Sequence, residues 1–562
     1  MGDYLASFRL QLRHLLVFLV LVSVSIFYLN SGPRTPVLTT SQKHTAKLTS
    51  LCPYSTSRKH IPTVLLQGTQ ASERTTNRTV LVLDQPGDKP AAFLPYAYPP
   101  RDLRFAQTVA TASKSAGTRR PAASMHPDDE RGTQLCALHR VPSSPRPAVP
   151  ASWRNSAVMF GMSTLADRVL WNLPVWAHWL PGAPSPPLDP DNGSVVRELP
   201  LVLVLTPPST ADDRNKHRDA VTETERRRAR EAVEEANVLG LHVTLRTREA
   251  DRFETRYFAL AEEMWAEAKR REQNEGVKTE WFVFADDDTF FPDFDSLARL
   301  LSSYDSNEDH IIGALSESTK QVNEWGHIAY GGGGILVSRG LLAKMNADGF
   351  WNDCLAKFGA AFGGDAMVTH CAALAMDRPV KEALKIDDTL HQLDIRGDGT
   401  GFFQSGFLIS SVHHWGSWFT LFPPWHESGA GDLRKGIALV GKAARAVGGD
   451  NWGRRYVFED GKVVVALGYS VTVEAKALSM DDLAKSEHTW WEFETFHPTR
   501  PGQEEGVDKR TYYITGVRQL DADGIFRLEH KNREGERVDL IWDQRTLGST
   551  GSRWRLSGRG GK

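Results

Sequence analysis

Cysteine is scarce in this sequence, and two other features that mark large classes of protein are missing. Only 4 of the 562 residues are Cys and no C-x-x-C motif occurs, which excludes a disulfide-dense scaffold and a cysteine-rich zinc or iron–sulfur array. The 67 Lys and Arg residues nearly balance the 69 Asp and Glu residues, so charge gives no reason to expect nucleic acid as a partner. With 41% hydrophobic and 24% charged residues, the chain is predicted to be mostly globular.

Long hydrophobic runs are almost absent too, with one exception near the N-terminus. Residues 15–29 read LLVFLVLVSVSIFYL and carry no charge, and Arg9 and Arg13 precede them. The run spans roughly 22 Å as a helix, short of a ~30 Å hydrocarbon core, but snorkelling side chains beside it extend its reach. We predict a transmembrane signal anchor at 15–29, a cytosolic tail at 1–14 and a lumenal remainder. A cleaved signal peptide and a buried helix are the alternatives, and a multi-span transporter is excluded.

Two further features agree with a lumenal location. Acceptor sequences for N-glycosylation occur at residues 77–79 and 192–194. The even number of Cys residues permits disulfides in an oxidising compartment. We predict the pairs Cys354–Cys371, which would close a local loop, and Cys52–Cys136; four buried free thiols are the alternative.

Proline content and apolar patterns divide the lumenal part into three regions. Residues 31–150 hold 15 of the 30 prolines. A segment so rich in proline cannot form long helices or central strands. We therefore predict a stem at 30–150. Within 151–430, apolar runs such as 199–205 and 281–285 alternate with helical patterns such as 253–268. This alternation predicts an α/β domain with a mostly parallel sheet covered by helices. Short strand-like pieces and turn sequences within 431–562 predict an appended, mostly β module.

The strongest chemical signal is the acidic triplet that follows the apolar run WFVFA at residues 281–285. Asp286, Asp287 and Asp288 are predicted at the carboxyl end of a buried strand, the edge at which open α/β sheets bind ligands. Adjacent carboxylates repel one another unless a cation lies between them, and oxygen ligands suit Mg²⁺ or Mn²⁺. A solvated acidic turn is the alternative. An aspartyl-phosphate phosphatase is excluded, because Ala285 stands where its motif needs Asp.

Three further motifs carry possible chemistry, each with a structural alternative. The glycine run 331–334 lets backbone approach a ligand, or is a flexible loop. Asp365, after two glycines and before an apolar helix, is a candidate base or only a helix N-cap. One imidazole of the pair His413-His414 could complete an oxygen-rich metal shell, or both are structural.

In chain order, these motifs resemble those of the Fringe-like glycosyltransferases of family 31, especially fungal and plant relatives. Residues 160–163 (FGMS), with Arg168 and Trp176, look like the family's opening strand and donor-binding turn, and the resemblance covers roughly 155–425. It implies a GT-A-type nucleotide-sugar transferase fold for the domain at 151–430. Many relatives have two acids where this chain has Asp365 followed by Ala366.

The resemblance also implies roles for single residues. Asp288 and His413 would bind Mn²⁺ or Mg²⁺, and Asp365 would be the catalytic base. Asp286 and Asp287 would contact the donor ribose and a water on the metal, which places Asp287 in the metal site as well. The remaining residues expected to bind the donor are Ser163, Arg168, Gly332 and Gly333.

The implied function is metal-dependent, inverting transfer of a hexose or N-acetylhexosamine from a UDP-sugar to a hydroxyl of a glycan or glycoprotein, in a β1,3 linkage. The enzyme would be a single-pass type II protein of the Golgi membrane, attached to the bilayer through residues 15–29. Trp325, Trp351 and Trp415 are candidates for stacking on sugar rings, although each is also a typical core aromatic. The alternatives are an inactive carbohydrate-binding protein on the same fold and a membrane-tethered structural protein.

Overall fold

A computed structural model describes most of the chain from residue 149 onward, together with three earlier strands. The described segments are 63–70, 108–109, 138–143, 149–182, 198–207, 218–250, 252–361, 363–428, 432–458, 461–479, 489–492, 504–520 and 524–543. The predicted anchor at 15–29, both glycosylation sequences, Cys52 and Cys136 lie outside these residues. Within them, no helix combines the length and apolar character needed to cross a membrane.

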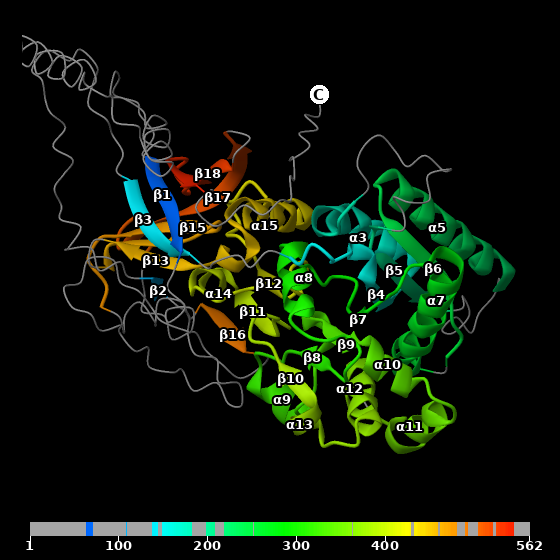
Figure 1. Cartoon of the computed structure of the whole chain (residues 1–562). Coiled ribbons are helices and arrows are strands. Elements are labelled where there is room, and N and C mark those ends of the chain that lie inside the picture. Colours follow the sequence, from blue (N-terminus) through cyan, green and yellow to red (C-terminus); the bar gives the residue numbers. More distant parts are fainter. Residues whose placement is uncertain are drawn as a thin grey trace, which may run out of the picture. The chain divides into compact units, whose positions relative to one another are not determined.

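The α/β domain is built on a seven-stranded, mostly parallel sheet, as the sequence predicts (Figure 1). Its strand order is β10-β8-β9-β7-β4-β5-β6, and only the two pairings made by β9 are antiparallel. The strands are β4 (Val158–Ser163), β5 (Leu201–Thr206), β6 (His242–Thr247), β7 (Trp281–Phe284), β8 (Ile311–Gly313), β9 (Ile335–Ser338) and β10 (Leu384–Ile386).

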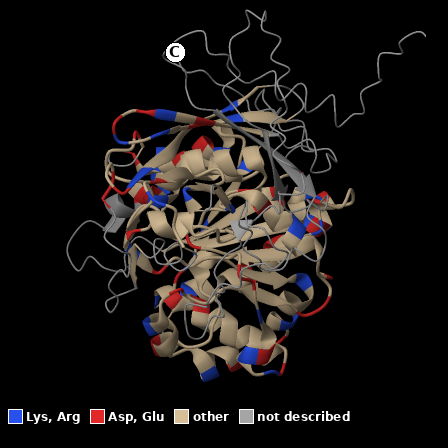
Figure 2. Cartoon of the chain, turned by 90° about the vertical axis from the view of Figure 1, so that its left-hand side faces the viewer, with Lys and Arg blue, Asp and Glu red and all other residues tan. Residues whose placement is uncertain are grey.

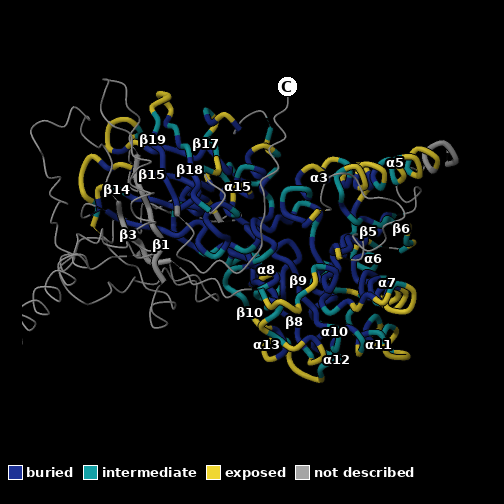
Figure 3. The backbone as a smooth tube through the Cα atoms, turned by 45° about the horizontal axis from the view of Figure 1, so that its top comes forward, coloured by how far each residue is buried: buried dark blue, intermediate teal, exposed yellow. Residues whose placement is uncertain are grey.

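Helices cover both faces of this sheet because alternate strand residues are apolar on each side. Phe160 belongs to one hydrophobic cluster and Met159 to another. Figure 3 shows the central strands buried, with exposed residues along the outer sides of helices such as α5 and α7. The first cluster includes α3 (Ala166–Trp179), α5 (Arg218–Val238) and α8 (Phe294–Ser302), and the second includes α6 (Phe253–Phe258), α7 (Leu260–Glu275), α10 (Arg339–Met345), α11 (Phe350–Phe358) and α12 (Gly364–Ala375).

The helical pattern at 253–268 forms two helices, α6 and α7, which meet at Ala259. Tyr257, Leu260 and Met264 from the apolar stripe are buried as expected. Phe253 is not, because 49% of its surface is exposed. The stripe therefore begins one turn later than the sequence predicts. A disulfide joins Cys354 to Cys371, as predicted, and so ties α11 to α12.

The C-terminal region is mostly β, as predicted, and forms a nine-stranded sheet in the order β2-β13-β14-β15-β17-β18-β19-β1-β3. Its C-terminal strands pair antiparallel. They are β13 (Arg455–Phe458), β14 (Val463–Ala466), β15 (Ser470–Glu474), β17 (Lys509–Gln519), β18 (Ile525–Lys531) and β19 (Arg537–Asp543), and helix α15 (Leu433–Val447) precedes them. Figure 2 shows charges of both signs interspersed on the viewed side, in line with the nearly neutral composition.

Three strands of this sheet come from the proline-rich segment. They are β1 (Thr63–Gln70), β2 (Thr108–Val109) and β3 (Leu138–Ser143). The proline content predicts no central strand here, and that expectation is wrong for β1, which lies between β19 and β3. The reason is local: the sequence of β1, TVLLQGTQ, contains no proline, so every residue can donate to the ladder.

The β module and the α/β domain share one hydrophobic cluster. The Tyr469 hydroxyl donates to the Leu421 carbonyl at 2.5 Å, and Phe403 packs against Trp452. A small sheet also joins the two parts: β16 (Trp490–Glu492) pairs with β11 (Ile395–Asp398), which pairs with β12 (Phe419–Thr420). The remaining elements are α9 (Thr319–Trp325), α13 (Val380–Ala383), α14 (Thr400–Gln404), η2 (Asn155–Ala157), η3 (Gly331–Gly333) and η4 (Gly449–Asn451).

This shared core predicts that the α/β domain does not fold without the module. A chain that begins at residue 54 and ends after Ser428 should be insoluble, because it exposes apolar surface that α15 and β13–β15 cover. A control chain that ends after Asp543 keeps all described strands and should stay soluble. Soluble yield and near-ultraviolet circular dichroism measure the difference. A soluble, cooperatively melting short chain would contradict the shared core.

Candidate active site

The acidic triplet lies directly after β7, at the carboxyl end of the parallel strands β4 and β7. The Ala285 N–H donates to the Gly161 carbonyl at 3.1 Å, and the Asp286 N–H donates to the Thr289 hydroxyl at 3.1 Å. An antiparallel bridge between Phe290 and Val412 holds the turn beside the histidine segment. Asp287 is only 6% exposed, so this is not a solvated acidic turn.

His413 and two of the three acids meet in the structure. The Nε2 atom of His413 lies 3.0 Å from Asp288 Oδ1 and 3.3 Å from Asp286 Oδ2. The Nδ1 atom lies 3.0 Å from the Gln392 carbonyl, to which an Nδ1–H would donate. A hydrogen bond of this kind fixes the ring and leaves Nε2 directed at the carboxylates, as in many metal-binding histidines.

Electrostatics couple these side chains strongly. Burial opposes the charged form of His413, but the adjacent Asp288 and Asp286 carboxylates raise its pKa well above the usual value. Burial likewise opposes ionisation of Asp288, yet His413 holds the pKa of this carboxyl well below its ordinary range. A divalent cation would take over the role of the imidazolium proton, because it stabilises the same ionised carboxylates.

His414 belongs to the same group, although the sequence motif selects only His413. Ligand atoms of Asp288, His413 and His414 all lie within 4.8 Å of one another. Neighbouring side chains in an extended segment point to opposite sides, but His414 has a positive φ of 54°. Its ring stacks on Trp418 at 3.5 Å, and its Nε2 lies 3.5 Å from Asp394 Oδ1.

Asp287 faces away from this group, toward β4 and α3. Thr164 donates to its carboxylate, and the Arg168 guanidinium binds both of its oxygens. The Trp176 indole N–H donates to its backbone carbonyl at 3.0 Å. Arg168 is about half exposed, with 55% of its side chain accessible. The structure therefore joins the predicted donor residue Arg168 to Asp287 and does not bring Asp287 to His413.

The glycine run lies beneath His413. Gly331–Gly333 forms a buried 3₁₀ turn. A Cβ atom on Gly332 would lie 2.0 Å from Nδ1 of His413, so only glycine leaves room for the ring. The Gly333 N–H donates to the Gln392 side-chain oxygen at 3.1 Å. Gly332 and Gly333, which the sequence predicts to bind the donor, lie against the His413 ring and the segment around Gln392.

This packing predicts that Gly332→Ala displaces the imidazole. We expect at least a tenfold loss of metal-dependent UDP affinity and a lower melting temperature, because overpacking a filled site is destabilising. Calorimetric titration with Mn²⁺ and UDP measures the first effect. Gly182→Ala is the control, since its added Cβ meets nothing closer than 3.6 Å. A Gly332→Ala protein with the metal dependence of the parent would contradict this role.

Asp365 lies in the first turn of α12, but it is not the N-cap, which is Gly363. Its carboxylate accepts from the Ala366 N–H at 2.9 Å and from the Gly331 N–H at 3.4 Å. Loss of solvation raises the pKa of Asp365 to about 6, the charge of Asp286 adds to the rise, and the two N–H groups oppose it. A carboxylate with a pKa in this range is able to accept a proton close to neutral pH.

Tyr257 fills the space between the two glycine motifs, which the sequence does not reveal. A Cβ on Gly331 would lie 2.7 Å from its hydroxyl oxygen, and one on Gly364 would lie 2.4 Å from its Cβ. The hydroxyl is buried and has no hydrogen-bond partner among the described residues. Burial raises the pKa of Tyr257, and Asp286 and Asp365 add to this shift, so the phenol is neutral.

Of the three predicted sugar-stacking tryptophans, Trp415 is a core residue, and the other two are partly buried against core clusters. Trp351 stacks on Phe258 at 4.5 Å. Trp415 is 1% exposed, and its indole N–H donates to the Asp288 carbonyl at 2.8 Å. Trp325 is partly buried against a small separate cluster. Trp171, by contrast, is exposed: 42% of its surface is accessible, and its ring stacks on that of Trp415 with 5.5 Å between the ring centres.

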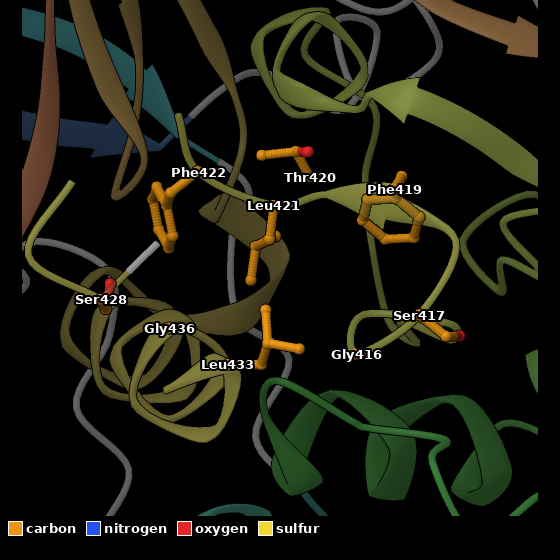
Figure 4. Close-up of a pocket in the computed structure, with 9 residues that line it drawn as sticks. All are labelled: Gly416, Ser417, Phe419, Thr420, Leu421, Phe422, Ser428, Leu433 and Gly436. Carbon is orange, nitrogen blue, oxygen red and sulfur yellow. The ribbon is translucent and has the colours of Figure 1, made fainter. Parts of the chain in front are cut away.

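A small pocket lies next to Trp171, between the loop after Trp415 and helix α15 (Figure 4). A Cβ on Gly416 would be 3.5 Å from the Trp171 ring and 4.0 Å from Leu433. The pocket is mainly apolar, with three hydroxyls. Its lining residues are Gly416, Ser417, Phe419, Thr420, Leu421, Phe422, Ser428, Leu433 and Gly436.

Comparison with known proteins gives two family matches and distant likenesses to solved structures. Residues 243–381 match the family described as Fringe-like, and residues 322–534 match "Protein of unknown function, DUF604". No curated protein matches the sequence. A crystal structure of mouse xyloside xylosyltransferase 1 in its apo form is 10% identical, with 41% of this chain and 84% of that chain covered and a TM-score of 0.24.

The family matches contain the residues of the site. The Fringe-like match includes the acidic triplet, the glycine run and Asp365, and the second match includes His413 and most of the β module. The chain is therefore a relative of the Fringe-like glycosyltransferases of family 31 and is itself a glycosyltransferase.

Proposed function

We propose that this enzyme transfers a hexose or N-acetylhexosamine from a UDP-sugar to a hydroxyl of a glycan or glycoprotein, with inversion and in a β1,3 linkage. The observation that carries the proposal is the placement of acids, imidazoles and a tuned base at one edge of the sheet. Asp286 connects the histidine group to the segment around Asp365. Its carboxylate lies 3.3 Å from His413 Nε2 and 3.5 Å from a Cβ built on Gly331, and the Gly331 N–H donates to Asp365.

The residues at this edge fit a divalent cation. One carboxylate and two imidazoles offer ligand atoms within 4.8 Å of one another, and such oxygen and nitrogen donors suit Mn²⁺ as well as Mg²⁺. Asp288 and His413 would hold the ion, with His414 as a third ligand. A bound ion would neutralise charge on the departing diphosphate.

The protein's own residues supply the proton acceptor and hold the acidic turn in place. Asp365 accepts the proton of the acceptor hydroxyl, which becomes the nucleophile at the anomeric carbon. Because the hydroxyl attacks from the face opposite the leaving UDP, one displacement inverts the anomeric centre. Thr164 and Arg168 hold Asp287 and so fix the turn that carries Asp286 and Asp288.

We also propose that the enzyme is a type II protein of the Golgi membrane, with residues 15–29 as its anchor. The charge-free run at 15–29 and the arginines before it support this location. Fluorescence microscopy of the full chain with a C-terminal tag tests it, and accessibility of the tag to protease in intact vesicles would contradict a lumenal catalytic domain.

The chemistry is tested with a panel of UDP-sugars, Mn²⁺ or Mg²⁺, and mixed glycan acceptors. We expect metal-dependent release of UDP with at least one donor and a product of inverted anomeric configuration by NMR. The inactive comparison is Asp365→Asn, which should lose glycosyl transfer because it lacks the proposed base. Release of UDP that is unaffected by chelation would contradict the metal site, and retention of configuration would contradict the direct displacement.

Transfer should decline on the acidic side of neutral pH. The carboxyl of Asp365, with a pKa near 6, can accept a proton only when ionised. The rate should therefore be nearly constant above about pH 7 and fall about tenfold per pH unit below the pKa. Initial rates between pH 4.5 and 8, with UDP affinity measured at each pH, separate this effect from loss of donor binding. A constant rate down to pH 5 would contradict the assignment.

A further inference from the structure

Ser163 ends β4 at the sheet edge that carries the acidic triplet. In the parallel pairing of β4 with β7, Gly161 lies opposite Phe284. Ser163 comes two residues after Gly161, and Asp286 comes two residues after Phe284, beyond the end of β7. Alternate residues of a strand share a face. The Phe284 ring contacts Tyr257 of α6 at 6.3 Å, so this is the face that α6 covers.

Arg256 of α6 reaches this point from the same face. Its Nε–H donates to the Ser163 hydroxyl at 3.0 Å, and its guanidinium lies 5.6 Å from the centre of the Phe253 ring. Such a contact between a cation and an aromatic face is favourable. It also accounts for Phe253, an apolar residue that is 49% exposed beside the site.

Arg256 differs from the other arginines nearby in having no acidic partner. Arg252 pairs with Glu254 at 3.3 Å, and Arg246 pairs with Glu263 at 2.9 Å. Among the described residues, Arg256 forms no ion pair, and burial alone lowers its pKa. A half-buried cation without a counter-ion is costly, and an anionic ligand would remove that cost.

We propose that Arg256, held by Ser163 and Phe253, binds an anionic group of the nucleotide-sugar. A guanidinium offers phosphate or carboxylate oxygens two parallel hydrogen bonds in a fixed fork. The anion is either a phosphate of the donor diphosphate or a carboxylate on the transferred sugar. The inference rests on the proposed function and adds to it a binding residue with no counterpart in the sequence motifs.

The test is calorimetric binding in the presence of Mn²⁺, with uridine, UMP, UDP, UDP-glucose and UDP-glucuronate as probes. Arg256→Ala should bind UDP and UDP-glucose at least tenfold more weakly than the parent and uridine equally well, if the anion is a phosphate. If it is the sugar carboxylate, only UDP-glucuronate should weaken tenfold. Arg256→Lys keeps the charge but not the fork, and should recover part of the loss.

The control is Arg230→Ala, because Arg230 pairs with Glu223 on the outer helix α5 and should leave every affinity unchanged. Arg256→Ala affinities within twofold of the parent for all five probes would overturn the inference and leave the proposed function intact. Uridine weakened as much as UDP would also overturn it, since Arg256 would then act on the nucleoside or on folding. If the parent binds no uridine nucleotide, the proposed function fails and the inference fails with it.

Discussion

Asp365→Asn is expected to slow glycosyl transfer by roughly 10²–10⁴-fold, the usual contribution of a positioned general base. The amide keeps the shape of the carboxyl group but cannot accept a proton near neutral pH. Its single oxygen can still accept from one of the two N–H groups that Asp365 contacts, that of Ala366 at Oδ1 or that of Gly331 at Oδ2, and the turn keeps its shape. UDP–Mn²⁺ affinity should therefore remain within a few-fold of the parent.

The same variant should not lose stability. Burial raises the pKa of Asp365 to about 6 in the folded protein, above the value of about 4 for a free side chain. A raised pKa means that the carboxyl stabilises the fold when protonated, and that this stabilisation is lost as the pH rises through about 6. At pH 7.5 the ionised carboxylate is therefore a cost that a neutral Asn removes. Asn also gives up one of the two N–H hydrogen bonds, so the melting temperature should stay close to that of the parent.

A matched control comes from the neighbouring helix. Asp353 is an exposed acid in the first turn of α11, so Asp353→Asn removes a carboxylate from the first turn of a helix outside the site. It should leave the transfer rate unchanged. Transfer by Asp365→Asn within a few-fold of the parent would contradict the general-base role and leave Asp365 as an ordinary first-turn acid.

The sequence predicts those parts of the site that depend on local pattern. A charge-free run before three acids indicates a buried strand that ends in carboxylates, and the structure has β7 followed by Asp286–288. Two cysteines 17 residues apart close a local loop, as the structure confirms. Each of these features depends on neighbours in the chain, which the sequence displays directly.

The sequence does not predict features that depend on contacts between distant segments. His414 joins the site because its backbone has a positive φ. Histidine does not require this backbone conformation, so the sequence gives no sign of it. Asp287 is separated from Asp288 by its contacts with Thr164 and Arg168 on other elements. The strand β1 finds its partner about 470 residues away, at β19, so proline counting alone could not place it.

The second large effect is expected from Asp288→Ala. Asp288 is 17% exposed and lies 3.0 Å from His413 Nε2 and 3.9 Å from His414 Nδ1. It is the one carboxylate in the group of possible ligands among the described residues. Loss of an outer partner of a metal ligand typically costs 10–100-fold in metal affinity. Loss of the carboxylate ligand itself should cost more and should abolish Mn²⁺-dependent UDP binding.

Asp287→Ala is the informative comparison, because the two acids are adjacent in sequence but differ in their contacts. Removing Asp287 takes the partner from Thr164 and Arg168, so we expect a lower melting temperature. The Mn²⁺ concentration at half-saturation should rise by no more than a few-fold, because the turn loses an anchor but keeps its ligand. Asp288→Ala should lose the response to Mn²⁺. Its melting temperature without metal should also fall, because the ionised carboxylate beside His413 stabilises the fold. Calorimetry and thermal melts on the same preparations measure both quantities. UDP–Mn²⁺ binding by Asp288→Ala as tight as in the parent would refute the metal site, and equal loss of the Mn²⁺ response in both variants would return Asp287 to the ligand set.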